Sequence, residues 1–206
     1  SAIVKTYASI LRERQTVGYM IASTFITAGL FGYITSSEQL FVDVYHLGPA
    51  FPIAFGSVAI AISIGNFLNS RLVIRQGMRR LSHSMTILFT LLGALIAALA
   101  FTGALSFWLF TALLSVTFGA FGMIASNYSA LAMEPVGRVA GSGSALFGAV
   151  TASGGALLGA VIGRAFDGTA APFAAGLATI GVLALVSVWI TERGKLFGPK
   201  PAPIAG

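Results

Sequence analysis

The chain has 206 residues, of which 56% are hydrophobic and only 9% are charged, with a formal net charge of +6 and no cysteine. Because a water-soluble domain carries roughly a quarter charged residues, this composition argues against a soluble protein and predicts a membrane protein. The lack of cysteine excludes disulfide and thiol chemistry, and basic residues placed between apolar runs indicate contact with anionic lipid headgroups rather than nucleic acid.

The first segment, residues 1–15, reads SAIVKTYASILRERQ and is amphipathic rather than signal-like. We expect it to be a cytoplasmic linker of a fragment that continues upstream, because the chain begins at Ser1 without a methionine. Residues 193–206 are expected to form a cytoplasmic tail, and residues 16–192 the transmembrane domain.

Six apolar runs are each long enough for a helix, which rises about 1.5 Å per residue, to cross a hydrocarbon core of about 30 Å. The runs are continuous and do not alternate, so they predict helices and argue against a β-barrel. The expected fold class is an all-α membrane protein with spans at Thr16–Phe41, Pro49–Leu72, Ser82–Phe101, Ser106–Ala132, Val139–Gly163 and Pro172–Ile190.

The hydroxyl and aromatic residues of two runs each follow steps of three or four residues, so each set shares one helix face. Such a face suits a cavity for an amphipathic ligand, although each hydroxyl could instead bond to a carbonyl one turn earlier in its own helix. For the two rows together we predict a substrate cavity. Its lining residues are Thr24, Thr27, Phe31, Thr35 and Glu38 in the first run, and Thr111, Ser115 and Phe118 in the fourth.

Basic residues are distributed unequally between the two sides of the predicted bundle. Eleven of the twelve lie on the side that holds both termini and the connection between the second and third runs, and Arg164 alone lies on the other. This bias predicts that both termini are cytoplasmic. We expect the connection NSRLVIRQGMRR to form a cytoplasmic loop that its arginines hold at the lipid headgroups. The arginines could also pair with helix ends when an inner gate closes, and plain surface anchoring is the alternative for each of them. The residues of interest are Asn69, Arg71, Arg75, Gly77, Arg79 and Arg80.

The fifth run contains small residues at four-residue spacing, the GxxxG pattern that lets two membrane helices approach until their backbones touch. Generic helix packing is the alternative reading of this pattern. The predicted packing seam consists of Gly148, Gly155, Gly159 and Gly163.

The segment NSRLVIRQGMRR at residues 69–80 resembles the basic loop between the second and third helices of a half of a major facilitator superfamily transporter. In particular, residues 29–81 and the segment SNYSALAMEPVGRVAGSGSALFGAV at residues 126–150 are similar to the carboxy-terminal half of Bcr/CflA-type drug:proton antiporters, which act in bicyclomycin and chloramphenicol resistance. The resemblance extends over roughly residues 18–190.

The resemblance implies two inverted three-helix repeats that form half of a transporter, with the substrate bound between the halves. The first and fourth helices would line the cavity, the second and fifth would meet a missing amino-terminal six-helix half, and the third and sixth would form the outer wall. The implied activity is export of small amphipathic compounds across the bacterial inner membrane by proton antiport. It needs the proton gradient but no cofactor, metal or catalytic residue.

Two alternatives have other mechanisms. Six helices could self-associate as a channel or a small transporter. An intramembrane serine hydrolase would use GSGSA at residues 141–145, but it needs a histidine on a neighbouring helix to activate the serine. The two histidines, His46 and His83, are isolated in the sequence.

Overall fold

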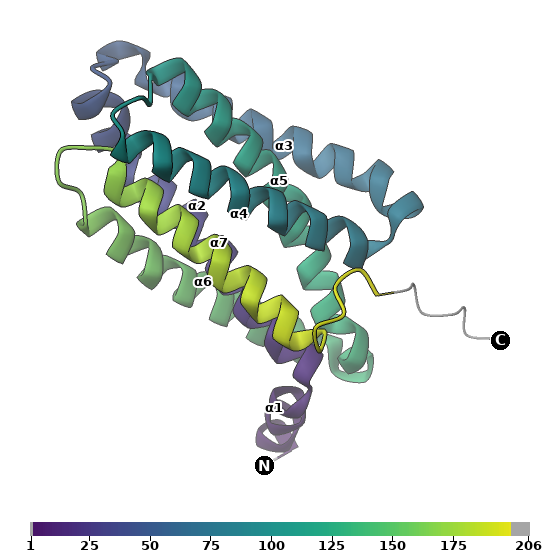
Figure 1. Cartoon of the computed structure of the whole chain (residues 1–206). Coiled ribbons are helices and arrows are strands. Elements are labelled where there is room, and N and C mark those ends of the chain that lie inside the picture. The colour runs from purple at the N-terminus through teal and green to yellow at the C-terminus, as the bar shows by residue number, and fades with distance from the viewer. Residues whose placement is uncertain (1, 199–206) are drawn as a thin grey trace.

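A computed structural model describes residues 2–198, and every regular element in this range is a helix (Figure 1). Six helices have 21–27 residues, long enough to cross a bilayer. In chain order the helices are α1 (Ala2–Arg12), α2 (Arg14–Glu38), α3 (Phe51–Gln76), α4 (Met78–Phe101), α5 (Phe107–Met133), α6 (Ala140–Arg164) and α7 (Ala171–Thr191). The predicted all-α membrane fold is therefore confirmed.

Two of the predicted spans form one continuous helical stretch. By length and hydropathy, five stretches of the described chain qualify as membrane spans, and one of them, Phe107–Arg164, has 58 residues. It holds both α5 and α6, which a short 3₁₀ segment, Glu134–Val139, separates; the backbone of Val136 leaves the helical region there. Pro135 lies at the start of this segment, where its missing N–H ends the regular hydrogen bonding of α5.

The basic connection between the second and third spans is shorter than the predicted loop. Helix α3 continues to Gln76 and α4 begins at Met78, so Gly77 alone joins them. Its φ of 80° lies in the left-handed region that glycine adopts without strain. Arg75 therefore lies on the last turn of α3 and Arg79 on the first turn of α4.

Helices α2, α4, α5 and α7 form the centre of the bundle. Helix α2 packs against α5, α6 and α7, while α5 packs against α3 and α4, and α4 packs against α7. Helix α3 finds its main partner in α5, and α6 finds its main partner in α2, so these two helices lie at opposite edges of the bundle in Figure 1. The helices that follow each other, α3 and α4 or α6 and α7, barely touch.

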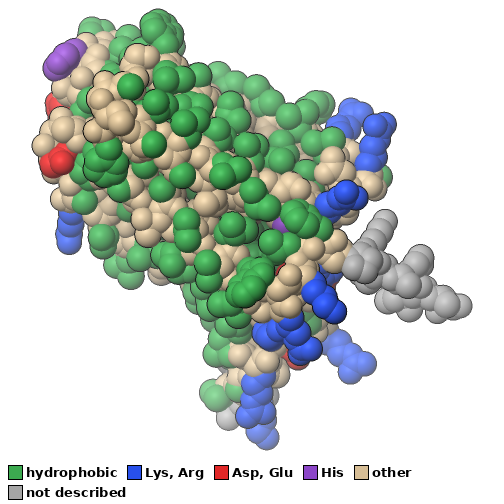
Figure 2. Space-filling view, in the orientation of Figure 1, with side chains coloured by type: hydrophobic (Ala, Val, Ile, Leu, Met, Phe, Trp, Pro, Cys, Tyr) green, Lys and Arg blue, Asp and Glu red, His purple; other side chains and the backbone are tan. Residues whose placement is uncertain are grey.

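The interior is filled by large rings, and much of the exterior is apolar. The fully buried side chains include Tyr19, Phe89, Phe118 and Tyr128, whereas Leu157 and Ile60 are exposed. Apolar side chains cover the flank of the bundle in Figure 2, and most Lys and Arg side chains gather at the end that holds α1, Gly77 and the residues after α7. We call this the basic end.

Candidate functional site

Arg79 joins the ends of two helices at the basic end. Its Nη2 donates to Glu134 Oε2 at 2.9 Å, directly after α5, and its Nε donates to Glu192 Oε1 at 3.2 Å, directly after α7. The Arg79 side chain is 17% exposed and that of Glu192 is 16% exposed. One arginine on α4 thus neutralises two carboxylates in a partly dry site, where charge-assisted hydrogen bonds are strong.

A chain of hydrogen bonds continues from Glu192 into the bundle. The Tyr19 hydroxyl of α2 donates to Glu192 Oε1 at 2.6 Å and lies 2.9 Å from His83 Nε2 of α4. The backbone N–H of Phe197 donates to His83 Nδ1 at 3.2 Å. Because a backbone N–H can only donate, Nδ1 accepts, and the neutral imidazole carries its proton on Nε2 and donates it to Tyr19. His83 and Tyr19 are both fully buried.

The first turn of α2 completes this arrangement by binding the end of α5. Gln15 Nε2 donates to the Leu131 carbonyl and to Glu134 Oε2, both at 2.8 Å. The Thr16 hydroxyl donates to the Ala132 carbonyl at 2.7 Å. These side chains satisfy carbonyls that the last turn of α5 leaves without helical partners. We call Gln15, Tyr19, Arg79, His83, Glu134 and Glu192 the basic-end network.

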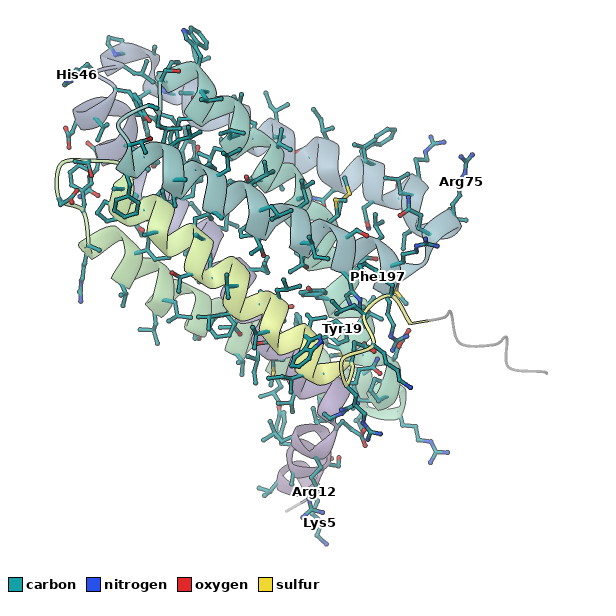
Figure 3. The ribbon with its side chains drawn as sticks, viewed as in Figure 1. Lys5, Arg12, Tyr19, His46, Arg75 and Phe197 are labelled. Atoms are coloured by element: carbon teal, nitrogen blue, oxygen red, sulfur yellow. The ribbon has the colours of Figure 1, made fainter. Side chains whose placement is uncertain are left out.

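Of the predicted gate residues, only Arg79 belongs to this network. Arg71, Arg75 and Arg80 are exposed, and Figure 3 shows Arg75 pointing away from the bundle. Arg71 lies over the ring of Phe67, 5.5 Å from its centroid. Asn69 instead joins α3 to α5, because its Oδ1 accepts from Asn127 Nδ2 at 2.6 Å. Lys200, also predicted on this side, lies outside the described residues.

The predicted cavity row of α2 packs along the predicted glycine seam of α6. A Cβ atom added at Gly155 would lie 2.8 Å from Thr27 Cγ2, and one at Gly163 would lie 2.7 Å from the Thr35 hydroxyl oxygen. Gly159 opposes Phe31 in the same way. The seam was expected to face a missing half, and its three last glycines face α2 instead, because only glycine lets α6 approach this row of side chains so closely.

The members of these two sets differ in their hydrogen bonds and exposure. Gly148 has no atom within 4 Å of its added Cβ, so it is not part of the contact with α2. Thr24 donates to the Met20 carbonyl at 2.8 Å, and Thr35 donates to the Phe31 carbonyl at 2.9 Å. For these two threonines the within-helix alternative is therefore observed. Glu38, at the end of α2, is exposed.

The predicted row of α5 is divided between three environments. Phe118 is fully buried, with its ring centroid 5.1 Å from that of Tyr33 in α2. Ser115 lines an apolar hollow of about 320 Å³ between α3, α4 and α5, together with Gly65 and Met85. The Thr111 hydroxyl oxygen is buried without a hydrogen-bond partner in the described part of the chain.

Aromatic side chains close the end of the bundle opposite the basic end. The Tyr33 ring stacks on Phe55 at 5.3 Å, and its hydroxyl donates to the Phe55 carbonyl. Tyr45, in the connection before α3, stacks on Phe110 and donates to the Leu105 carbonyl. Burial raises the pKa of Tyr45 to about 12, so its hydroxyl remains a donor at physiological pH.

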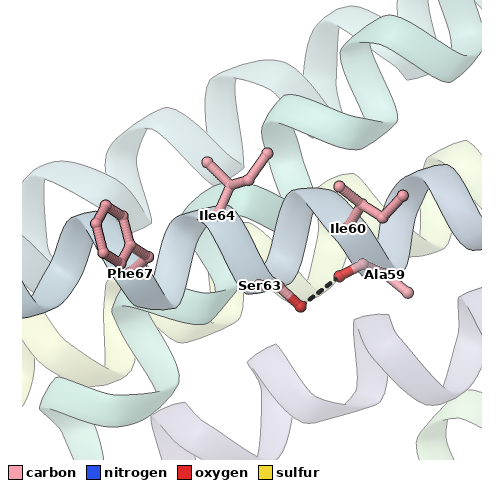
Figure 4. Close-up of a pocket in the computed structure, with 5 residues that line it drawn as sticks. All are labelled: Ala59, Ile60, Ser63, Ile64 and Phe67. Atoms are coloured by element: carbon pink, nitrogen blue, oxygen red, sulfur yellow. Dashed lines mark hydrogen bonds between the residues drawn. The ribbon is translucent and has the colours of Figure 1, made fainter.

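Helix α3 turns an apolar face away from the bundle. Figure 4 shows Ile60, Ile64 and Phe67 along this face, with the Ser63 hydroxyl bonded to the Ala59 carbonyl at 3.0 Å. The three apolar side chains are 53–62% exposed. Because the serine satisfies its own hydrogen bond, the face suits either acyl chains or another helix.

Comparison with known proteins gives two relatives of this chain. Over 199 residues it is 29% identical to the uncharacterized MFS-type transporter YdgK of Bacillus subtilis, an alignment that covers 93% of this chain and 48% of that protein. Over 187 residues it is 27% identical to a bicyclomycin resistance protein homolog of Haemophilus influenzae, covering 90% of this chain and 46% of that protein. The chain is therefore similar in sequence to about half of an MFS-type (major facilitator superfamily) transporter and to about half of a bicyclomycin resistance protein homolog.

The chain spans about half the length of the curated relatives it matches. No family model and no solved structure matches it. The two relatives are named for transport and for bicyclomycin resistance, and neither is named as an enzyme. The geometry agrees, since the Ser144 hydroxyl bonds to the Gly141 carbonyl while both ring nitrogens of His83 have other partners. The serine hydrolase alternative is therefore wrong.

The sequence interpretation missed most of the basic-end network. Tyr19, Gln15 and Glu192 were not singled out, and His83 was considered only as a catalytic residue. One signal was available: Glu134 and Glu192 directly follow the fourth and sixth apolar runs, on the same side as Arg79. Acidic residues at helix ends near a basic connection are candidates for ion pairs.

Proposed function

We propose that this chain is the carboxy-terminal half of a secondary active transporter that exports small amphipathic compounds by proton antiport. The observation that carries the proposal is that nearly the whole chain aligns with about half of two transporter-related proteins, one of them named for bicyclomycin resistance. The resemblance of residues 29–81 and 126–150 to the carboxy-terminal half of Bcr/CflA-type antiporters supports the assignment to that half. The partner would be an amino-terminal six-helix half, and the proton gradient would supply the energy.

Two inverted three-helix repeats account for the packing of the bundle. In such a repeat α2, α3 and α4 correspond, in this order, to α5, α6 and α7. The contact of α2 with α6 then matches the contact of α5 with α3. The contact of α2 with α7 matches the contact of α5 with α4. The sparse contacts of α3 with α4 and of α6 with α7 also correspond. Superfamily transporters move such units about a site near the bilayer midplane.

The basic-end network would keep this half rigid while the two halves rock. Arg79 links α4 to the ends of α5 and α7, and Tyr19 adds α2. The distribution of basic residues favours a cytoplasmic basic end, and hence cytoplasmic termini in the bacterial inner membrane. Arg71, Arg75 and Arg80, which are exposed, would contact lipid headgroups or the other half.

The substrate cavity would lie between this half and the other. Its proposed lining keeps the two sequence rows, Thr24 to Glu38 and Thr111 to Ser115, without Phe118, which is fully buried within this half. The members best supported are Thr35 and Glu38, which are exposed, and Thr111, whose hydroxyl has no partner among the described residues. The exposed face of α3 in Figure 4 is proposed to meet the other half.

The full-length protein, expressed in a drug-sensitive bacterium, tests the function. We expect lower accumulation of bicyclomycin or another small amphipathic drug, and loss of the effect when an uncoupler removes the proton gradient. Unchanged accumulation across a panel of such compounds, or export that persists without the gradient, would contradict the proposal. The mass of the natural polypeptide separates a half-transporter, which requires about twice this length, from the self-associating six-helix alternative.

A further inference from the structure

Asn66 of α3 and Ser126 of α5 form an exposed polar pair within the membrane-spanning part of the bundle. The Ser126 hydroxyl lies 3.2 Å from Asn66 Oδ1 and 3.1 Å from the Gly122 carbonyl oxygen of its own helix, so it can donate to either. Both side chains are exposed. Asn66 lies near the middle of the 26 residues of α3, so the pair is well inside the hydrocarbon depth.

A glycine on α5 leaves the Asn66 amide uncovered. A Cβ atom added at Gly122 would lie 3.3 Å from Asn66 Cγ and 2.8 Å from the Ile62 carbonyl oxygen. Backbone thus approaches backbone beside the pair, and no side chain at position 122 covers the amide. Within residues 2–198 the amide accepts its one hydrogen bond from Ser126. Both N–H groups of Asn66 Nδ2 and a lone pair of Oδ1 therefore remain available.

A similar pair, one turn closer to the basic end, has no such capacity. Asn127 Nδ2 donates to Asn69 Oδ1 at 2.6 Å and to the Met123 carbonyl at 2.7 Å. Asn127 is only 2% exposed, and these two bonds use both of its N–H groups. Asn69 and Asn127 therefore serve the packing of α3 on α5, whereas Asn66 and Ser126 keep hydrogen-bonding groups that this packing does not use.

Acyl chains cannot satisfy the free groups of Asn66. A polar group without a hydrogen-bond partner is costly in hydrocarbon, and polar side chains within membrane spans face the bundle interior or a water-filled cavity. The apolar face of α3 in Figure 4, formed by Ile60, Ile64 and Phe67, lies about a third of a turn around the helix from Asn66. That face can meet the other half while Asn66 opens onto the cavity.

The proposed lining of α5 leads to the same place. Ser126 follows Ser115 by eleven residues, about three helical turns, so both lie on one face of α5. The row of α2 offers less to a substrate, because Thr27 and Phe31 pack against the glycines of α6. No charged residue occurs in α5 or at positions 51–70 of α3. A compound bound beside Asn66 therefore meets only neutral hydrogen-bonding groups of these two helices.

We infer that Asn66, with Ser126 beside it, is a substrate-binding residue that recognises an uncharged amide of the transported compound. The carboxamide of Asn66 offers an N–H donor next to a C=O acceptor, and a lactam or a primary amide presents the complementary C=O and N–H side by side. Ser126 can keep its bond to the Gly122 carbonyl while Oδ1 accepts from the compound. The inference rests on the proposed function and names the chemical group that the same cavity recognises.

Cysteine labelling of the full-length protein tests whether the pair faces water. This chain has no cysteine, so labelling of the parent gives the background. A charged, water-soluble maleimide should label Ser126→Cys, because the reactive thiolate forms in water and not among acyl chains. Leu91→Cys is the control, since Leu91 is 62% exposed on α4, the proposed outer wall, and should stay unlabelled. Absence of labelling at position 126, or equal labelling at position 91, would overturn the inference.

Binding of bicyclomycin and of other neutral lactams to the purified full-length protein tests the chemistry. Stabilisation against melting measures the dissociation constant, and Asn66→Ala should raise it about tenfold through the loss of its hydrogen bonds. Ser63→Ala is the matched control on α3, because the Ser63 hydroxyl bonds to the Ala59 carbonyl within its own helix, and it should bind like the parent. Melting without a compound shows that each variant is folded.

The outcomes separate this inference from the proposed function. Proton-driven export with unchanged lactam binding in Asn66→Ala would leave the function standing and overturn the inference, as would equal weakening in Ser63→Ala or a parent that binds none of the lactams. Weaker binding in Asn66→Ala alone, without proton-driven export by the parent, would support the binding residue and contradict the proposed antiport.

Discussion

Gly159 of α6 lies directly against Phe31 of α2. A Cβ atom added at position 159 would lie 2.5 Å from the Phe31 Cβ and 2.7 Å from the backbone nitrogen of Gly32. Neither atom belongs to the free end of a flexible side chain, so neither can rotate away. The row of α2 and the glycine row of α6, which the sequence presents as separate patterns, are two sides of one helix contact.

Gly159→Ala should therefore force α6 away from α2. We expect the free energy of unfolding to fall by about 1–3 kcal/mol, as for other overpacked interiors. Melting of the purified protein in detergent measures the loss. Gly148→Ala is the matched control on the same helix, since its added Cβ meets no atom within 4 Å, and its effect should stay within about 0.5 kcal/mol. Equal losses at the two positions would contradict the close contact at Gly159.

Gly65→Ala should be the more damaging change in the corresponding contact of α3 with α5. A Cβ atom at position 65 would overlap the carbonyl group of Gly119, which is backbone and cannot yield without moving a helix. We expect a loss near or above about 3 kcal/mol, or failure to accumulate in the membrane, measured by folded yield and melting. Gly56→Ala, also on α3, meets nothing within 4 Å and should behave like the parent. A stable Gly65→Ala protein would mean that α3 and α5 are farther apart than described.

The positions of the membrane-spanning helices could be predicted from the sequence, because the thickness of the bilayer sets the length of the apolar run that each helix needs. The fourth predicted run, Ser106–Ala132, differs from α5, Phe107–Met133, by one residue at each end. The prediction of a loop over residues 69–80 was wrong, because the long side chains of arginines at a helix end can reach water while the backbone stays helical. A loop predicted from charged residues alone is therefore too long: it spans residues 69–80, whereas Gly77 is the one residue between the two helices.

The partners of each face could not be predicted from one sequence. Periodicity says that Thr27, Phe31 and Thr35 share a face of α2, but it does not say whether a cavity, lipid or α6 covers that face. The same limit applies to the basic-end network. His83 and Phe197 are 114 residues apart in the chain, and their bond depends on how α4 and α7 pack, which no local pattern encodes.

Thr111→Val tests whether the row of α5 contacts substrate. The buried Thr111 hydroxyl has no partner within residues 2–198, so its removal should cost no stability, and export should change if the substrate is its partner. Drug susceptibility and melting of the full-length protein measure the two effects. The control is Thr117→Val, because the Thr117 hydroxyl bonds to the Leu113 carbonyl at 2.8 Å. It should lose about 0.5–1 kcal/mol and leave export unchanged. Unaltered export by Thr111→Val would remove Thr111 from the cavity lining.

Arg79→Gln should destabilise the basic end more than any other single arginine change in the described chain. It leaves the carboxylates of Glu134 and Glu192 without their shared counter-charge, and removing one partner from a buried pair costs about 3–5 kcal/mol. We expect about 2–3 kcal/mol, because Glu134 is 30% exposed and water can screen it. Exposed Arg75 and Arg80 provide the controls, and their glutamine variants should melt like the parent.

A double-mutant cycle separates the ion pair from the loss of arginine packing. Glu192→Gln in the Arg79→Gln background removes one of the two repelling carboxylates, so the double variant should be more stable than the sum of the single losses predicts, by about 1 kcal/mol or more. The Tyr19 hydroxyl can still donate to the amide oxygen of the new glutamine, so the bond chain to His83 is preserved. Melting of the four proteins at low and high salt measures the coupling. Additive losses would show that Arg79 acts through the packing of its methylene groups and not through Glu192.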